Sequence, residues 1–303
     1  MLKPFNSMLL CADRSSEAQD ALRKASILAR YLDASIELFA CDADHAWAVA
    51  QSPRSASARA ALDSCLAASR TYVEALRGSI AATDLRIATS VACVRGMVEG
   101  VVERVDAARH DLVVKSFDTG PERDRWNTTS ADLCLVQQSR VPLLLTRARP
   151  WSTPLRIWVA LDLRRCDARL GRRVLGIARA LAQRCDGRCT VVHCEGGADA
   201  GSTLRGVTEA RRFFGLVDGS VAEVLEGPPL EVLSPTLRAA GADLLLIARG
   251  ASVAGPARVE PLVERLLGEV GCDVLVIPDE AVTRPVSSGP VAPVTADAPH
   301  RQG

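Results

Sequence analysis

A glycine-containing loop, ARGASVAG, follows an apolar run in the last third of the chain and precedes a helical stretch. Glycine lets backbone N–H groups approach phosphate oxygens closely, and the N-terminus of a following helix adds a favourable field for an anion. The loop therefore raises the question of nucleotide phosphate binding, which depends on whether its glycines are in register. The first part of the loop supplies five candidate ligand contacts, Ala248, Arg249, Gly250, Ala251 and Ser252.

Two aspartates end matching apolar runs: Asp13 closes SMLLCAD and Asp162 closes LRIWVALD. Ligands of parallel sheets bind outside the carboxyl ends of the strands, so both carboxylates are candidate ligand contacts. The alternative is that each aspartate caps the following helix or turn. Arg164 and Arg165 follow Asp162 and could hold an anion together with Arg249, or they are ordinary surface charges.

The segment RCDGRCTVVHCE contains Cys185, Cys189, His193 and Cys194, which are residue types that bind metals. In a strand, Cys189 and His193 would lie ~13 Å apart, and Cys194 would face the opposite side. A zinc ion needs all its ligands within ~2.3 Å. We therefore expect no metal site here.

Ten cysteines in a chain that opens without a secretory signal pattern indicate free thiols in a reducing cytoplasm. Cys11, Cys41 and Cys194 lie near expected strand ends, where a redox role is open. The default for such thiols is that they pack as small buried hydrophobes.

Composition excludes several classes of protein. The 303 residues carry a formal net charge of +1, and no basic cluster suggests a nucleic-acid partner. No apolar stretch approaches the ~20 residues that a membrane span requires. Basic residues are almost all arginine, with lysine only at positions 3, 24 and 115, a skew that we attribute to genomic composition. Ser-His-Asp, paired-carboxylate and Walker arrangements are absent, so we expect no enzyme activity.

The two halves of the chain repeat one pattern. Each opens with an apolar strand that ends in aspartate, followed by an amphipathic helix, residues 15–32 and 166–185. Asp111 and Pro142 are 31 positions apart, as are Asp243 and Val274, in the strand pairs HDLVVK/VPLLLT and ADLLLIA/DVLVIP. Equal spacing of matching strands indicates duplication.

Alternating strands and helices, with continuous apolar strands, predict parallel sheets covered on both faces. Each half is expected to be a five-stranded, doubly wound α/β domain. The first half holds an additional helical stretch, Ala56 to Arg77. The predicted organisation is a first domain over residues 1–149, a linker over 150–154, a second domain over 155–280 and a Pro-rich, disordered tail over 281–303.

The strand order and spacing over residues 1–280 resemble the tandem universal stress proteins, of the universal stress protein E type. The resemblance implies two Rossmann-like domains of the adenine-nucleotide alpha hydrolase-like kind. It also implies that they pack as an intramolecular pseudo-dimer through VPLLLT and DVLVIP. In nucleotide-binding relatives, the aspartate at the positions of Asp13 and Asp162 faces the adenosine.

The ATP-binding branch of that family carries the phosphate motif G-x2-G-x9-G-[ST] after its fourth strand. In the second half the motif positions fall on Ala248, Ala251, Glu260 and Pro261. Proline has no N–H donor, and a glutamate carboxylate repels phosphate. The loop glycines are out of register, and Gly268 would lie inside the helix.

In the first half the motif positions fall on Ser116, Thr119, Thr128 and Thr129. WNTTSADL is better explained as a helix start, with Thr129 or Ser130 as the N-cap. We therefore expect the phosphate motif to be degenerate in both halves.

The sequence predicts a non-enzymatic, cytoplasmic stress-response binding or signalling module with no cofactor and no metal. Its partner is an unknown protein, and a further homodimer stays open. The alternatives are an ATP- or AMP-binding stress protein with weak or no hydrolysis, and a thiol-based redox sensor.

Overall fold

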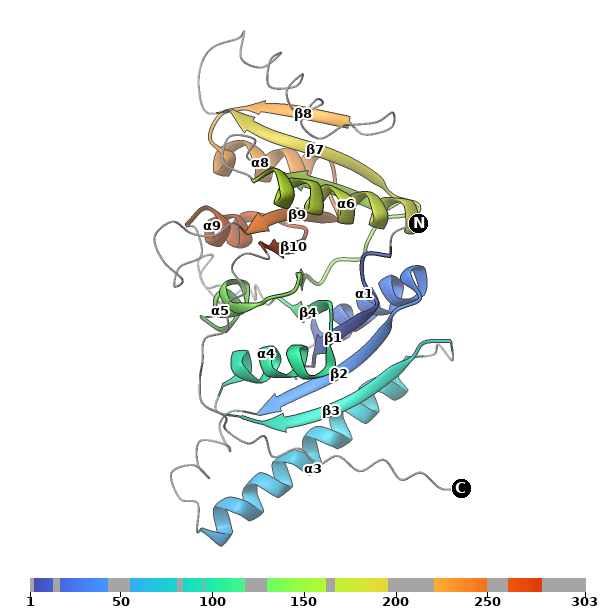
Figure 1. The fold of residues 1–303 in the computed structure, drawn as a ribbon, viewed down its shortest axis with the longest axis vertical. Coiled ribbons are helices and arrows are strands. Elements are labelled where there is room, and N and C mark those ends of the chain that lie inside the picture. The colour runs from blue at the N-terminus through green and yellow to red at the C-terminus, as the bar shows by residue number, and fades with distance from the viewer. Residues whose placement is uncertain are drawn as a thin grey trace.

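The computed structural model describes residues 3–12, 17–42, 55–80, 84–94, 96–117, 130–161, 167–195, 221–249 and 261–279. Within them, strands from both halves form one sheet in the order β3-β2-β1-β4-β5-β10-β9-β6-β7-β8 (Figure 1). The strands are β1 Ser7–Cys11, β2 Ser35–Asp42, β3 Ile87–Cys93, β4 Leu112–Ser116, β5 Leu143–Thr146, β6 Arg156–Ala160, β7 Arg188–Glu195, β8 Val221–Glu226, β9 Leu244–Arg249 and β10 Asp273–Pro278.

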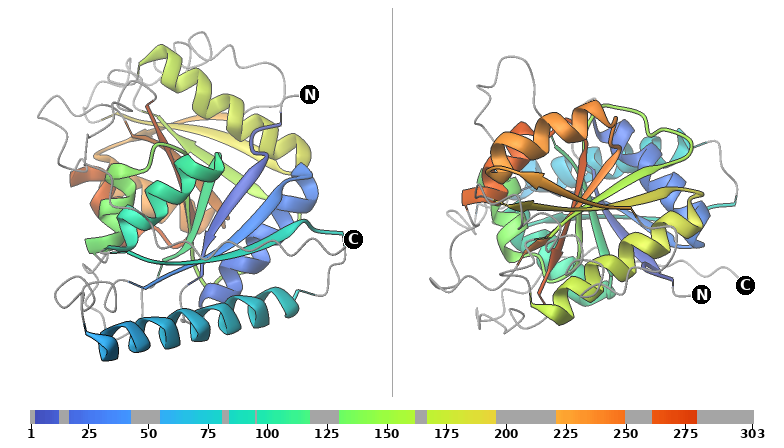
Figure 2. Two further views of the ribbon diagram at one scale, coloured as in Figure 1. Left: turned by 60° about the horizontal axis from the view of Figure 1, so that its bottom comes forward. Right: turned by 90° about the horizontal axis from the view of Figure 1, so that it is seen from above.

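Each half contributes five strands that pair in parallel, and the two halves meet where β5 and β10 pair antiparallel. Val274 pairs with Leu145 and Leu275 with Leu144. The predicted pairing of VPLLLT with DVLVIP is therefore confirmed. The strands turn progressively along the sheet (Figure 2), which is the normal twist of such structures.

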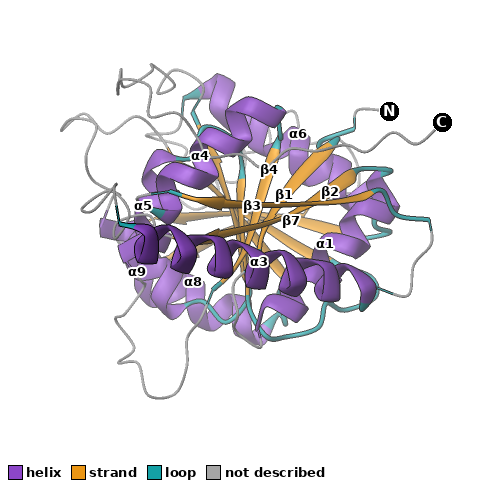
Figure 3. Cartoon of the chain, turned by 90° about the horizontal axis from the view of Figure 1, so that it is seen from below, coloured by secondary structure: helices purple, strands orange, loops and turns teal. Residues whose placement is uncertain are grey.

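Helices cover both faces of the sheet and surround it when the molecule is viewed along its long axis (Figure 3). They are α1 Glu17–Leu32, α3 Ala56–Gly78, α4 Met97–Ala108, α5 Ser130–Gln138, α6 Ala168–Arg184, α8 Pro229–Ala239 and α9 Pro261–Glu269. Residues of α1, α3 and α6 share one apolar core, and residues of α4, α5, α8 and α9 share the other. Leu9 and Leu10 fall in different cores because successive strand residues face opposite sides.

The predicted elements agree closely with the structure. α1 lies within the predicted helix 15–32, α6 lies within 166–185, and α3 extends the predicted stretch 56–77 by one residue. The helix expected between β7 and β8 would fall on residues 196–220, outside the described part of the chain, as does the tail. Over the residues that the structure describes, no helix is both long and apolar enough to cross a membrane.

Asp111 and Asp243 hold the start of the first strand in each half. Asp111 accepts hydrogen bonds from the backbone N–H groups of Asn6 and Ser7, and Asp243 accepts one from the backbone N–H of Arg156 at 2.9 Å. Aspartates at matching positions therefore anchor the first strand in both repeats.

The linker between the halves packs into the structure. The indole N–H of Trp151 donates to Asp273 Oδ2 at 2.7 Å, and the Ser152 hydroxyl donates to Asp243 at 3.0 Å. Lys24 from the first half forms an ion pair with Asp273 at 2.7 Å and donates to the carbonyl of Arg147. A buried polar cluster thus joins α1, the linker and β10.

Candidate ligand site at the carboxyl edge of the sheet

The strand order places a topological switch point in each half. Chain connections leave in opposite directions from β1 and β4, and again from β6 and β9, where a crevice forms in doubly wound folds. Cys11 pairs with Lys115 at the first switch, and Ala160 pairs with Ile247 at the second. The segments expected to bind ligand begin immediately after these strand ends.

Most of the predicted ligand contacts follow those ends directly. Asp13, Asp162, Gly250, Ala251 and Ser252 lie outside the described residues, so their predicted contacts stay predictions. Arg164 and Arg165 also lie outside.

Ala248 and Arg249 are the two predicted contacts that the structure places, in the last two positions of β9. Ala248 packs against the apolar core, with no polar side chain to offer a ligand. The guanidinium of Arg249 donates to the carbonyls of Val136 and Gln137, and to that of Ser139 at 2.8 Å. These carbonyls belong to the C-terminal end of α5 in the other half.

Burial lowers the pKa of Arg249 to about 10, so the side chain remains a cation at neutral pH. A cation at the C-terminus of a helix is favourable because the last carbonyls lack partners within the helix. Arg249 therefore clamps α5 in this structure.

Arg147 makes the reciprocal clamp. It follows β5 in the first half, and its guanidinium donates to the carbonyl of Leu267 in the last turn of α9 and to that of Cys272, directly before β10. The same guanidinium lies 4.8 Å from the ring centre of Phe117, which follows β4. Each helix that follows a candidate phosphate loop is thus held at its far end by an arginine of the opposite half.

The N-terminal ends of α9 and α5 lie where the phosphate motif would need backbone N–H donors. α9 begins at Pro261, so its first residue offers no N–H donor, and Gly268 lies within the helix as expected. α5 begins at Ser130. Glu260, Thr119, Thr128 and Thr129 lie outside the described residues.

A buried ion pair lies next to the first switch point. Lys115 Nζ is 2.8 Å from Asp132 Oδ1 in the first turn of α5, and both residues are buried. The sequence interpretation missed this pair. The rarity of lysine in the sequence could have pointed to it. Lys24 and Lys115 are 3% and 8% exposed, and each pairs with an aspartate.

Glu37 forms the centre of a second polar cluster that the sequence did not reveal. Its carboxylate accepts from Arg104 Nε at 2.6 Å and from the Ser90 hydroxyl, and it contacts His110 Nε2 at 3.1 Å. His110 Nδ1 lies 2.8 Å from the hydroxyl of Ser7. A neutral ring protonated on Nε2 satisfies both of its contacts.

The left-handed residue that ends α4 is Arg109, with φ 56°, and the backbone N–H of His110 donates to the carbonyl of Val105 in the last turn. The side chain of His110 is buried in the polar cluster. The cluster faces the amino edge of β1, away from the switch point.

The N-cap of α6 is Asp167. Its Oδ1 accepts hydrogen bonds from the backbone N–H groups of Arg169 and Leu170. These hydrogen bonds lower the pKa of Asp167. Asp162 lies outside the described residues, so both interpretations of it, ligand contact and cap of a turn, stay predictions.

The cysteine and histidine side chains in strand β7 and just before it pack within the protein interior. His193 is buried, with Nδ1 3.1 Å from the carbonyl of Leu161, immediately before Asp162. Burial raises the pKa of the Cys185 and Cys189 thiols to about 11. In the part of the chain that the structure describes, no three His, Cys, Asp or Glu side chains gather as a metal ligand set would.

Solved structures match this architecture over nearly the whole chain. A functionally unknown protein from Pseudomonas aeruginosa PAO1 superposes with a TM-score of 0.70 and 19% identity, covering 92% of this chain and 95% of that chain. A protein described as a putative universal stress protein from Pseudomonas aeruginosa UCBPP-PA14 gives 0.69 and 19%, with the same coverage. A universal stress protein from Archaeoglobus fulgidus DSM 4304 gives 0.61 and 14%, covering 90% of this chain and 98% of that chain.

The chain has the universal stress protein fold. Its tandem arrangement fits the coverage of both halves in these matches. No family model matches the sequence, and no curated protein matches it. The finer resemblance to the universal stress protein E type stays a prediction.

Proposed function

We propose that the chain is a tandem universal stress protein that acts as a non-enzymatic stress-response binding or signalling module in the cytoplasm. Its mechanism is a change in contact with a ligand or protein partner, without turnover of a substrate. The antiparallel pairing of β5 with β10 supports an intramolecular pseudo-dimer, in which the two halves take the places of two subunits.

The geometry of Arg249 carries this proposal. Among the predicted anion-binding side chains, it is the one that the structure describes, and its guanidinium is bound to carbonyls at the end of α5. α9, which follows the same loop, starts with Pro261 and so lacks an N–H donor at its first residue. A phosphate at this edge would lose two of the interactions that normally hold it.

ATP or AMP binding with weak or no hydrolysis is the alternative. The position of both candidate loops at topological switch points favours it, because ligands of such folds bind there. It requires that loop residues 250–260 or 118–129 supply the phosphate donors.

A thiol-based redox sensor is less well supported. A reactive cysteine needs a low pKa and access to solvent. Burial raises the pKa of Cys185, Cys189 and Cys272 to about 11, so these thiols are protonated at neutral pH. Cys41 and Cys194, which are partly buried, are the remaining candidates for a redox role.

The absence of turnover is tested by phosphate release. The purified full chain is incubated with ATP and Mg²⁺, beside a buffer blank and an Asp162→Ala variant. We expect release at the blank rate from both proteins. Release that exceeds the blank and is lost in Asp162→Ala would overturn the non-enzymatic proposal.

A further inference from the structure

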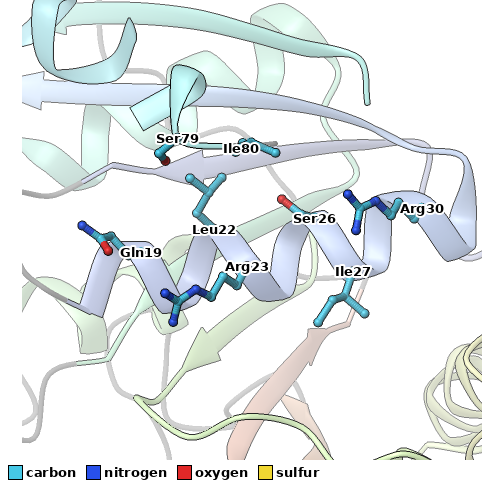
Figure 4. A pocket seen from close by; sticks show the side chains of 8 residues that line it. All are labelled: Gln19, Leu22, Arg23, Ser26, Ile27, Arg30, Ser79 and Ile80. Atoms are coloured by element: carbon cyan, nitrogen blue, oxygen red, sulfur yellow. The ribbon is translucent and has the colours of Figure 1, made fainter. Parts of the chain in front are cut away.

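The outer flank of α1 holds a groove that none of the functions above uses. It lies between this helix and the turn after α3, and its volume is about 400 Å³ (Figure 4). That volume falls in the range of roughly 300–1,000 Å³ that is typical of small-molecule sites. The groove lies along the side of a helix and is lined by none of the predicted ligand contacts.

The floor of the groove carries an unsatisfied hydroxyl. Ser26 is only 7% exposed, and its Oγ has no hydrogen-bond partner among the described residues. In Figure 4, Ser26 projects from the same side of α1 as Leu22 and Arg30, toward Ser79 and Ile80. A buried polar group without a partner is unfavourable, so a ligand atom that bonds to Ser26 would gain affinity.

A cationic group stands one turn away. Leu22, Ser26 and Arg30 are spaced by four residues, so they share one face of the helix over about 12 Å. The Arg30 side chain is 51% exposed, and its Nε is 3.7 Å from Asp84 Oδ2, too far for a hydrogen bond. Its N–H groups can therefore turn to an anion beside Ser26.

The rest of the lining is mixed, with Leu22 and Ile80 beside the polar Gln19 and Ser79. Leu22 is buried against the core, and the half-buried Ile80 packs against the same core from the turn after α3. Leu22 is already only 3% exposed, so a hydrocarbon chain here would bury its own apolar surface and the exposed part of Ile80. Arg23 also borders the groove, but it forms a close ion pair with Asp20 at 3.0 Å.

We propose that this groove binds an amphipathic carboxylate, a hydrocarbon chain with one terminal anionic group. The carboxylate accepts hydrogen bonds from Ser26 and from the guanidinium of Arg30. The chain lies along Leu22 and Ile80. The inference is independent of nucleotide binding, since it uses no residue of either candidate phosphate loop.

The test is a calorimetric titration of the full chain with octanoate, with octanol and propionate as probes that lack the charge or the chain. Ser26→Ala and Arg30→Gln remove the two polar contacts. Arg265→Gln is the matched control, because Arg265 is also 51% exposed and pairs with an acidic residue, Glu269, on a distant helix.

We expect saturable binding of octanoate and none of octanol or propionate. Each groove variant should weaken octanoate about tenfold, the loss expected for one charge-assisted hydrogen bond, and Arg265→Gln should leave it unchanged. The proposal is overturned if octanoate does not saturate, if octanol binds equally well, or if neither groove variant weakens binding.

Discussion

The buried carboxylate of Glu37 is stabilised by the side chains around it. Burial raises its pKa, but hydrogen bonds from His110, Arg104 and Ser90, with the Arg104 charge, outweigh burial and lower it to about 2. The folded state therefore favours the carboxylate more than the unfolded state does. This stabilisation is present above the unfolded pKa and is lost as the pH falls from about 4.5 toward 2.

Glu37→Gln should lower the free energy of unfolding by about 3 kcal/mol at pH 7, because the shift in pKa measures the interactions that the charge makes. The deficit should shrink at pH 3. Urea denaturation at both values measures it, and Glu103→Gln, on the exposed side of α4, is the control. An equal deficit at both values would show that the ionised carboxylate is not what stabilises the fold.

Among the elements, Arg249 and Arg147 connect the two halves. Each holds the helix that follows the candidate phosphate loop of the opposite half. Arg249 extends from the end of β9 to α5, and Arg147 extends from the end of β5 to α9. The antiparallel pairing of β5 with β10 makes this exchange possible, because it brings the end of each strand beside the start of its partner.

Arg249→Gln should remove the clamp on α5 and destabilise the protein by about 2 kcal/mol, since several carbonyls would lose a charged donor. Hydrogen exchange should speed up across residues 130–138 and change little in α9. Arg238→Gln, an exposed arginine in the last turn of α8, is the control. Unchanged exchange in α5 would argue that Arg249 serves a ligand instead.

Much of the secondary structure and its arrangement could be predicted from the sequence. The apolar runs and their equal spacing predicted the strands and the duplication, and the resemblance to tandem universal stress proteins implied the joining of the halves through the last strands. Periodicity does not reveal which polar residues meet, so Glu37 with His110 and Lys115 with Asp132 were missed. Their members are 73 and 17 positions apart in the chain, and only the parallel pairing of strands and the return of α5 bring them together.

For the molecule as a whole, one buried cluster fixes the halves together. Lys24 lies between Asp273 and the Trp151 ring, 5.7 Å from the ring centre, so it links α1 of the first half to the linker and to β10. Burial raises the pKa of Asp273, although Lys24 opposes that shift. Burial therefore opposes the ionisation of Asp273, and Lys24 offsets part of that cost.

Lys24→Met should cost about 3–5 kcal/mol at pH 7, because it leaves a buried carboxylate without its cation. The deficit should diminish on acidification, since Asp273 has a raised pKa and takes up a proton before ordinary carboxylates do. Thermal unfolding at pH 7 and pH 5 measures both effects. Lys3→Met, which removes a weaker pair at 3.9 Å, should cost at most about 1 kcal/mol. A loss no larger than that of Lys3→Met would refute this role of the cluster.

The central claim is that the carboxyl edge of this fold no longer holds nucleotide phosphates. Calorimetric titration with ATP and AMP, with and without Mg²⁺, tests it most directly, once the protein is shown to carry no bound nucleotide. The account predicts no saturable heat up to millimolar nucleotide. Micromolar binding that is lost in Asp13→Ala or Asp162→Ala would contradict it.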